Sequence, residues 1–226
     1  MKKIFTLVVF VSLIFSSIGS YAQTEDFGIR FGAELTKELG KKFELGIQEE
    51  GRLNQNASEI DRFLTSFGAK YEISKLFDVG AYYTWIYANN QKDDYYENRH
   101  RFGTWIKAGK KVNRFKFSLK EQLMITYRDE NLGTYKYNPK TYLRSRFEVS
   151  YNVKNSPIKP YLSAQMHYQL NNPSGNVIDQ WRYVAGMEYD INKKFTIDAY
   201  LMRDEEVNVK KPLNTTVVGT MLKFKL

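Results

Sequence analysis

Arginine and glutamate side chains alternate with apolar ones in residues 141–153, which read TYLRSRFEVSYNV. Arg144, Arg146 and Glu148 share one parity, and Phe147 belongs to the apolar parity between them. A guanidinium group forms two parallel hydrogen bonds with a carboxylate, and it binds phosphate-like anions in the same way. The spacing therefore predicts a row of charges on one face, suited either to ion pairing or to binding an anion.

A period of two sustained over about a dozen residues is typical of a β-strand with one apolar and one polar face. Strands of soluble proteins are usually shorter, at ~5–6 residues. Similar alternation recurs in eleven segments, approximately 27–39, 43–54, 62–73, 77–88, 99–109, 114–128, 141–153, 160–170, 181–191, 195–204 and 214–226. We therefore predict an all-β fold, an antiparallel transmembrane β-barrel of about 10–12 strands with lipid outside and the charged face inside.

The connections between these segments alternate between short and long. The long ones, 55–61, 89–98, 129–140, 171–180 and 205–213, are rich in Asn, Asp and Gly. Outer-membrane barrels place short turns in the periplasm and longer loops outside the cell. Because single-chain bacterial barrels have even strand numbers, the odd count predicts either a missed strand or a first segment that is not an ordinary wall strand.

The first residues have the layout of a secretory signal peptide. Lys2 and Lys3 precede an apolar run over 4–18, and Ala22 ends a segment of small residues. The run is shorter than the ~20 residues of a membrane helix. We predict a cleaved signal peptide over 1–22 and an outer-membrane β-barrel over 23–226. The chain has no cysteine, which excludes disulfides and a lipid anchor on a leading cysteine.

Parity assigns the charged side chains to the lumen, where both signs are interleaved. We predict a lumenal ionic cluster that consists of Glu50, Arg52, Arg101, Lys120, Arg144, Arg146, Glu148, His167, Arg182 and Glu188. In a barrel of this size the interior is only slightly wider than one that side chains can fill. Either the charges form a salt-bridge network that plugs the barrel, or they line a narrow polar pore or a pocket for a small anionic solute.

Aromatic residues are abundant, with 17 Tyr, 15 Phe and 3 Trp. On the outward parity they gather at both ends of the predicted strands, for example Trp85 toward a long loop and Phe43 and Phe224 toward the short turns. Such rings mark the two membrane interfaces. Glu49 and Glu121 also fall on the outward face, where a charge is costly, so we predict a nearby β-bulge or a position close to the rim.

Three segments carry a resemblance to a known family: 50–52 (EGR), 144–148 (RSRFE) and 181–189 (WRYVAGMEY). They resemble the domain of unknown function 2490, a family of predicted outer-membrane β-barrel proteins of Gram-negative bacteria. The resemblance covers nearly the whole chain after the leader. It implies the barrel fold and an outer-membrane location, and it implies no catalytic residue because the family carries no established activity.

The preferred interpretation is an outer-membrane barrel with a charged lumen and either a structural role or a role in binding or transporting a small solute. The alternative is an outer-membrane enzyme, a lipid- or peptide-hydrolysing barrel with its active site near the extracellular rim. Its candidates are few, because His100 has no serine two residues away and His167 falls in the lumen beside Gln165. The sequence contains no metal-ligand spacing and no phosphate-binding glycine loop. We therefore predict neither a metal nor a cofactor.

The formal net charge of +9 would suggest nucleic acid as a partner of a soluble protein. In an exported barrel the positive excess faces lumen, loops and anionic head groups, so we expect no nucleic-acid partner. Leu222, Phe224 and Leu226 alternate to the end of the chain, which resembles the C-terminal strand that barrel-insertion machinery recognises. We expect a monomer whose partners are outer-membrane lipid, that machinery and, in the pocket interpretation, a small anionic solute.

Overall fold

A computed structural model describes residues 24–90, 95–128 and 138–226. Within these ranges the chain is all-β, and no helix there is long and apolar enough to cross a membrane. The predicted signal peptide, 1–22, lies outside the described residues.

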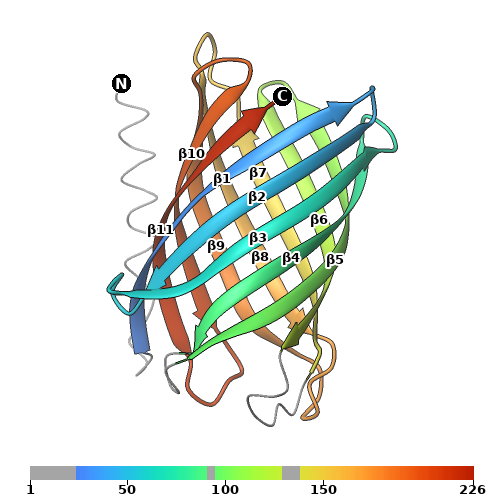
Figure 1. Cartoon of the computed structure of the whole chain (residues 1–226). Helices are drawn as coiled ribbons and strands as arrows, with labels where there is room; N and C mark the ends of the chain where they lie inside the picture. The colour runs from blue at the N-terminus through green and yellow to red at the C-terminus, as the bar shows by residue number, and fades with distance from the viewer. Residues whose placement is uncertain (1–23, 91–94, 129–137) are drawn as a thin grey trace.

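Eleven strands form one closed barrel (Figure 1). They are β1 (Thr24–Leu39), β2 (Phe43–Asn54), β3 (Glu59–Glu72), β4 (Phe77–Asn90), β5 (Tyr95–Val112), β6 (Phe115–Arg128), β7 (Lys140–Tyr151), β8 (Ile158–Gln169), β9 (Val177–Asp190), β10 (Phe195–Glu206) and β11 (Leu213–Lys225). Sequence neighbours pair antiparallel throughout, as the alternation of short and long connections predicts. Closure satisfies the backbone groups of every strand and leaves no sheet edge.

The barrel closes through a parallel pair, β1 with β11, whose register runs from Thr24 opposite Leu213 to Thr36 opposite Lys225. The expectation of an even strand number is therefore wrong, and the first segment is an ordinary wall strand. The physical reason is that a parallel ladder also satisfies the backbone hydrogen-bonding groups. As a consequence, β1 begins at the long-loop end and β11 ends at the short-turn end (Figure 1).

Side chains from β10 and β11 reinforce this seam by ion pairs to β1. On the outer wall, the Arg203 guanidinium donates two hydrogen bonds to the Glu25 carboxylate, at 2.5 and 2.7 Å, across β11. At the turn end, Lys225 Nζ lies 2.5 Å from Glu38 Oε1. Ion pairs from β10 and β11 to β1 therefore add to the backbone hydrogen bonds of the parallel pair.

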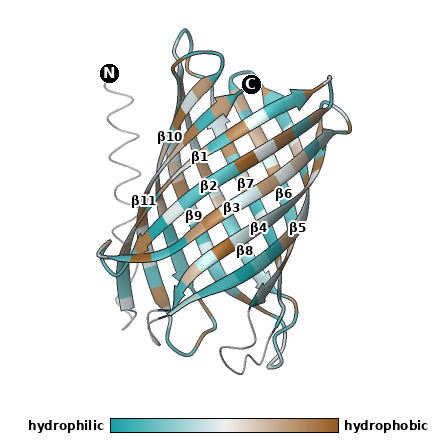
Figure 2. Cartoon of the chain, viewed as in Figure 1, coloured by the Kyte–Doolittle hydropathy of each residue, from teal (hydrophilic) through white to brown (hydrophobic). Residues whose placement is uncertain are grey.

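Large apolar side chains cover the outer wall of the barrel. Ile106 is 45% exposed, Phe147 49% and Leu201 57%, although all three lie in the middle of long strands. Figure 2 shows brown and teal residues alternating along the strands, as expected when successive side chains face opposite sides. At the turn end, Phe195 and Phe224 stack with their ring centroids 4.6 Å apart. The outer wall therefore suits an apolar environment.

The two outward carboxylates, Glu49 and Glu121, lie in the middle of β2 and β6. Thr65 Oγ1 donates a hydrogen bond of 2.9 Å to Glu49 Oε2, and Ser145 Oγ donates one of 2.6 Å to Glu121 Oε2. The β6 ladders contain no register shift, and β2 has one only between Arg52 and Leu53. The predicted bulge or rim position is therefore wrong for these residues. Each carboxylate instead accepts a hydroxyl from the next strand, which offsets part of its desolvation.

Candidate functional site in the barrel interior

The interior is filled at one end and hollow at the other. Most buried inward residues belong to the strand halves nearest the long loops, and they include Leu64, Thr84, Ile86, Ala88, Glu97, Met124, Thr126, His167, Gln169, Met202 and Asp204. Only a few, such as Ser118 and Asp198, lie in the halves nearest the turns. The lumen is thus packed toward the long loops by the side chains of its own wall.

Two cavities extend from the turn end of the lumen past the middle of the strands. A cavity of about 350 Å³ extends from Thr36 and Glu44, near the turn between β1 and β2, to Arg101 and Arg144. A second cavity of about 680 Å³ extends from Arg114, at the turn between β5 and β6, to Arg30 and Arg182 on the opposite walls. Both are lined by Glu50 and Arg52. We call the two cavities together the vestibule.

Five arginines lie at the deep end of the vestibule: Arg30, Arg52, Arg101, Arg144 and Arg182. They come from β1, β2, β5, β7 and β9, so they surround the lumen. Their charges are close enough to repel one another, as between Arg144 and Arg52 or Arg182 and between Arg101 and Arg144. We call this group the arginine floor.

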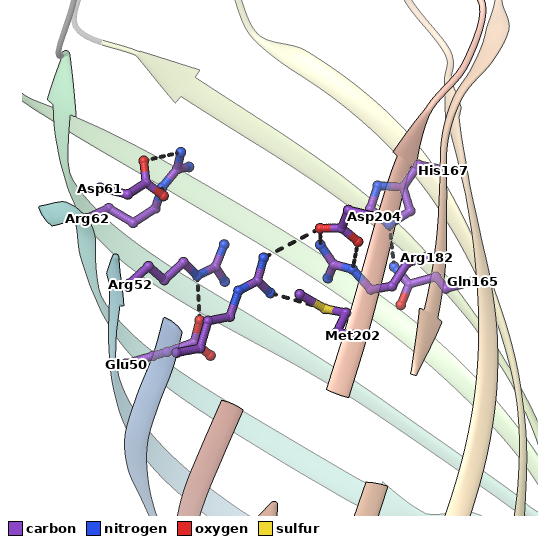
Figure 3. Close-up of polar contacts among 10 residues, drawn as sticks. Glu50, Arg52, Asp61, Arg62, Gln165, His167, Arg182, Met202 and Asp204 are labelled. Atoms are coloured by element: carbon purple, nitrogen blue, oxygen red, sulfur yellow. Dashed lines mark hydrogen bonds and ion pairs between the residues drawn. The ribbon is translucent and has the colours of Figure 1, made fainter. Parts of the chain in front are cut away.

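Carboxylates neutralise part of the arginine floor. Arg52 Nε donates a hydrogen bond of 2.5 Å to Glu50 Oε1, and Arg182 donates two to Asp204, at 2.6 and 2.7 Å. Figure 3 shows these two groups on facing sides of the lumen. Arg30 reaches Asp204 from across β11, with Nη2 at 3.5 Å from Oδ2. Glu50 and Asp204 are thus the counter-charges of three guanidinium groups, those of Arg30, Arg52 and Arg182.

The other two arginines have no carboxylate partner among the described residues. Arg101 Nε donates a hydrogen bond of 3.2 Å to the Thr126 hydroxyl. Arg144 Nε is buried, and no hydrogen-bond acceptor of the described residues reaches it. Among residues 24–90, 95–128 and 138–226, no carboxylate oxygen lies within 4.0 Å of either guanidinium group. The floor therefore carries an excess of positive charge next to open volume.

The structure divides the predicted lumenal cluster. Arg52, Arg101, Arg144 and Arg182 belong to the arginine floor, and Glu50 pairs with Arg52. Lys120, Arg146, Glu148 and Glu188 lie along the vestibule walls, and His167 lies in the packed half. Arg146 is 3.5 Å from Glu148, but no ion pair joins Glu148 to Arg144 among the described residues. Glu188 pairs with Lys223 at 2.7 Å, and Lys120 Nζ lies 4.4 Å from the Trp105 ring centroid.

The predicted cluster omits four members of this interior network: Arg30, Asp198, Asp204 and Lys223. Asp204 is the direct cross-strand partner of Arg182, and Lys223 also reaches Asp198 at 2.9 Å. Parity places all four side chains in the lumen. The sequence pattern therefore identifies them as inward charges, but it does not identify which inward charges lie opposite one another.

Two tyrosine rings lie flat against the wall of the second cavity, over glycines of neighbouring strands. The Tyr161 ring covers Gly186, and the Tyr200 ring covers Gly219; a Cβ atom added at either glycine would overlap the ring. Because the rings lie along the wall, they leave the centre of the lumen open. The Tyr161 hydroxyl then donates a hydrogen bond of 2.9 Å to Asp198.

The two histidines lie in different surroundings. His100 is on the outer wall, where its Nδ1 is 2.8 Å from the Tyr83 hydroxyl. His167 is 2% exposed, and its Nε2 is 2.7 Å from Gln165 Nε2. The described part of the chain contains no group of three His, Asp or Glu side chains placed to hold a metal ion.

Fold and interior together define a closed eleven-stranded β-barrel with a charged, half-filled lumen. The chain belongs to the family described as "Protein of unknown function (DUF2490)", whose model matches residues 27–211. The resemblance drawn from the three short segments is thus confirmed.

Among solved structures, the chain is similar to the translocator domain of autotransporter NalP from Neisseria meningitidis. The identity is 10%, the match covers 78% of this chain and 72% of that chain, and the TM-score is 0.36. No curated protein matches the chain.

Proposed function

We propose that this chain is a barrel of the outer membrane of a Gram-negative bacterium, with its short turns in the periplasm. The exposed apolar outer wall supports this location, because water would make such a surface unstable. The stacked aromatic rings near the strand ends fit the two interfaces. In this setting the protein is a monomer, and β11 is the segment that insertion machinery recognises.

We further propose that the vestibule receives a small anionic solute from the turn end and that the arginine floor binds it. The observation that carries this proposal is the charge imbalance of five guanidinium groups and two carboxylates, with Arg101 and Arg144 lacking a carboxylate partner among the described residues. Guanidinium groups in a low-dielectric setting bind phosphate or carboxylate groups strongly. The ligand class is therefore a small phosphate- or carboxylate-bearing solute.

Replacing Arg144 by Gln is expected to weaken anion binding at least about tenfold, because a charged hydrogen bond contributes about 1.5–3 kcal/mol. Isothermal titration of the folded full-length barrel with inorganic phosphate measures the change. Lys75→Gln, on the exposed turn between β3 and β4, is the matched loss of one charge and should leave affinity unchanged. Equal weakening by both variants would mean that bulk charge, and not the arginine floor, attracts the anion.

In a planar bilayer, the purified barrel is expected to show no steady conductance, because wall side chains fill the lumen toward the long loops. Glu148→Gln should not open it, since Glu148 lies in the vestibule and not in the packed half. Its pair with Arg146 is 3.5 Å long and partly exposed, so the stability change should stay within ~0–1 kcal/mol. Steady single-channel currents would instead support the narrow-pore interpretation.

The alternative of a hydrolytic site near the extracellular rim stays a hypothesis. Two of the long connections at that rim include residues 91–94 and 129–137, which lie outside the described ranges. Hydrolysis of lipid or peptide by the purified barrel would favour it.

A further inference from the structure

The outer wall carries an apolar groove of about 930 Å³ over strands β6 to β11. Its base includes Ala185, which lies in register between Leu162 on β8 and Leu201 on β10. These leucines are 55% and 57% exposed, so they stand on either side of the small alanine. In the next row toward the turns, Ala199 lies beside Met187, which is 43% exposed. Small residues flanked by large ones make this part of the wall concave.

Aromatic residues form the end of the groove nearest the turns. Phe115 and Tyr151 both line it, with ring centroids 4.9 Å apart. Three residues beyond Tyr151, the turn between β7 and β8 carries Lys154, and the turn between β9 and β10 carries Lys193 and Lys194. The apolar groove thus ends at an aromatic pair, next to cationic turns.

The lysines of these turns form no ion pair with a carboxylate in the part of the chain that the structure describes. Residues 152–157 and 191–194 contain no Asp or Glu. Lys154, Lys193 and Lys194 are exposed, and none of them lies within 4.0 Å of a carboxylate in the described part of the chain. Such lysines at a membrane surface attract anionic head groups.

We propose that the groove binds the acyl chains of one anionic glycerophospholipid, with its phosphate held by Lys154, Lys193 and Lys194. The proposal rests on the membrane location given above. A lipid fits the site because a single molecule combines apolar chains with a negative head group, in the same order as the groove and the turns. A second copy of the barrel fits less well, because two copies meeting here would bring like-charged turns together.

In the test, the folded full-length barrel takes up lipid from micelles that contain phosphatidylglycerol or phosphatidylcholine with identical chains. Native mass spectrometry then counts the lipid molecules that stay bound. The wild type is expected to retain phosphatidylglycerol with about fivefold to tenfold preference. Ala199→Phe fills the groove and should reduce retention about tenfold. Ala81→Phe, an outward alanine on β4 across the barrel, should retain lipid as the wild type does.

The triple variant Lys154→Gln, Lys193→Gln and Lys194→Gln changes only exposed turns, so it tests the head-group site without disturbing the wall. It should lose the preference for phosphatidylglycerol while still retaining lipid. Equal retention by Ala199→Phe and Ala81→Phe, an unchanged preference in the triple variant, or a dimer that Ala199→Phe abolishes would each overturn the proposal. Heat-modifiable gel migration of each reconstituted variant reports folding, and a wild type that fails to insert would overturn the membrane location as well.

Discussion

Asp204→Asn is expected to lower the free energy of unfolding by about 3–5 kcal/mol, because it leaves buried guanidinium groups without their counter-charge. Asp204 accepts both hydrogen bonds from Arg182 and is the only carboxylate of the described residues within 4.0 Å of Arg30. The side chains of Asp204, Arg30 and Arg182 are 10%, 13% and 17% exposed, so water replaces the lost partner poorly. Denaturant unfolding of the barrel in lipid vesicles, followed by heat-modifiable migration, measures the loss.

The matched control is Glu38→Gln, which also removes one carboxylate from an ion pair. Glu38 pairs with Lys225 at the turn end, where their side chains are 54% and 49% exposed. Solvent and salt screen such a pair, so stability should scarcely change. If Asp204→Asn were as mild as Glu38→Gln, water would fill the lumen around the arginine floor, and the packed half of the barrel would not exist as described.

The strand assignments could be predicted from sequence because the outer wall imposes a period of two. The predicted segment 141–153 corresponds to β7, Lys140–Tyr151, and 77–88 to β4, Phe77–Asn90. The largest difference is at β5, predicted over 99–109 and observed from Tyr95 to Val112. Backbone pairing continues beyond the apolar band, where side chains have no need to alternate, so the pattern ends before the strand does.

Closure could not be predicted in the same way. The pairing of β1 with β11 joins the two ends of the barrel, and no local pattern specifies whether that pair is parallel. The odd number of predicted strands did indicate a parallel closing pair. The rule that single-chain bacterial barrels have even strand numbers led to a different interpretation.

The interior network shows the same limit at the level of side chains. Parity predicts that Arg144 and Glu148 both face the lumen, yet four residues along a strand separate them by ~13 Å. They therefore lie at different depths, Arg144 in the arginine floor and Glu148 on the vestibule wall. Arg30 and Asp204 meet because β1 follows β11 around the barrel, so their contact depends on the closure that the sequence did not reveal.

Leu201→Arg is expected to cost about 2–4 kcal/mol of stability, because in the proposed membrane location it places a charge on the outer wall near the middle of the bilayer. The cross-strand partners of Leu201 are Ala185 and Val218, and neither can accept a hydrogen bond from the new guanidinium group. Equilibrium unfolding in vesicles of fixed lipid composition measures this cost.

Ile106→Arg provides a contrasting case on the same outer wall. Ile106 is 45% exposed and lies directly opposite Glu121 on β6, whose carboxylate faces outward. An arginine at this position can pair with that carboxylate, so its cost should be clearly smaller than that of Leu201→Arg. Adding Glu121→Gln to Ile106→Arg should restore the full cost, and the difference is the coupling energy of a double-mutant cycle. If Ile106→Arg were as costly as Leu201→Arg with or without Glu121, the Glu121 carboxylate would not face the lipid beside residue 106, and the register of β5 against β6 would be incorrect.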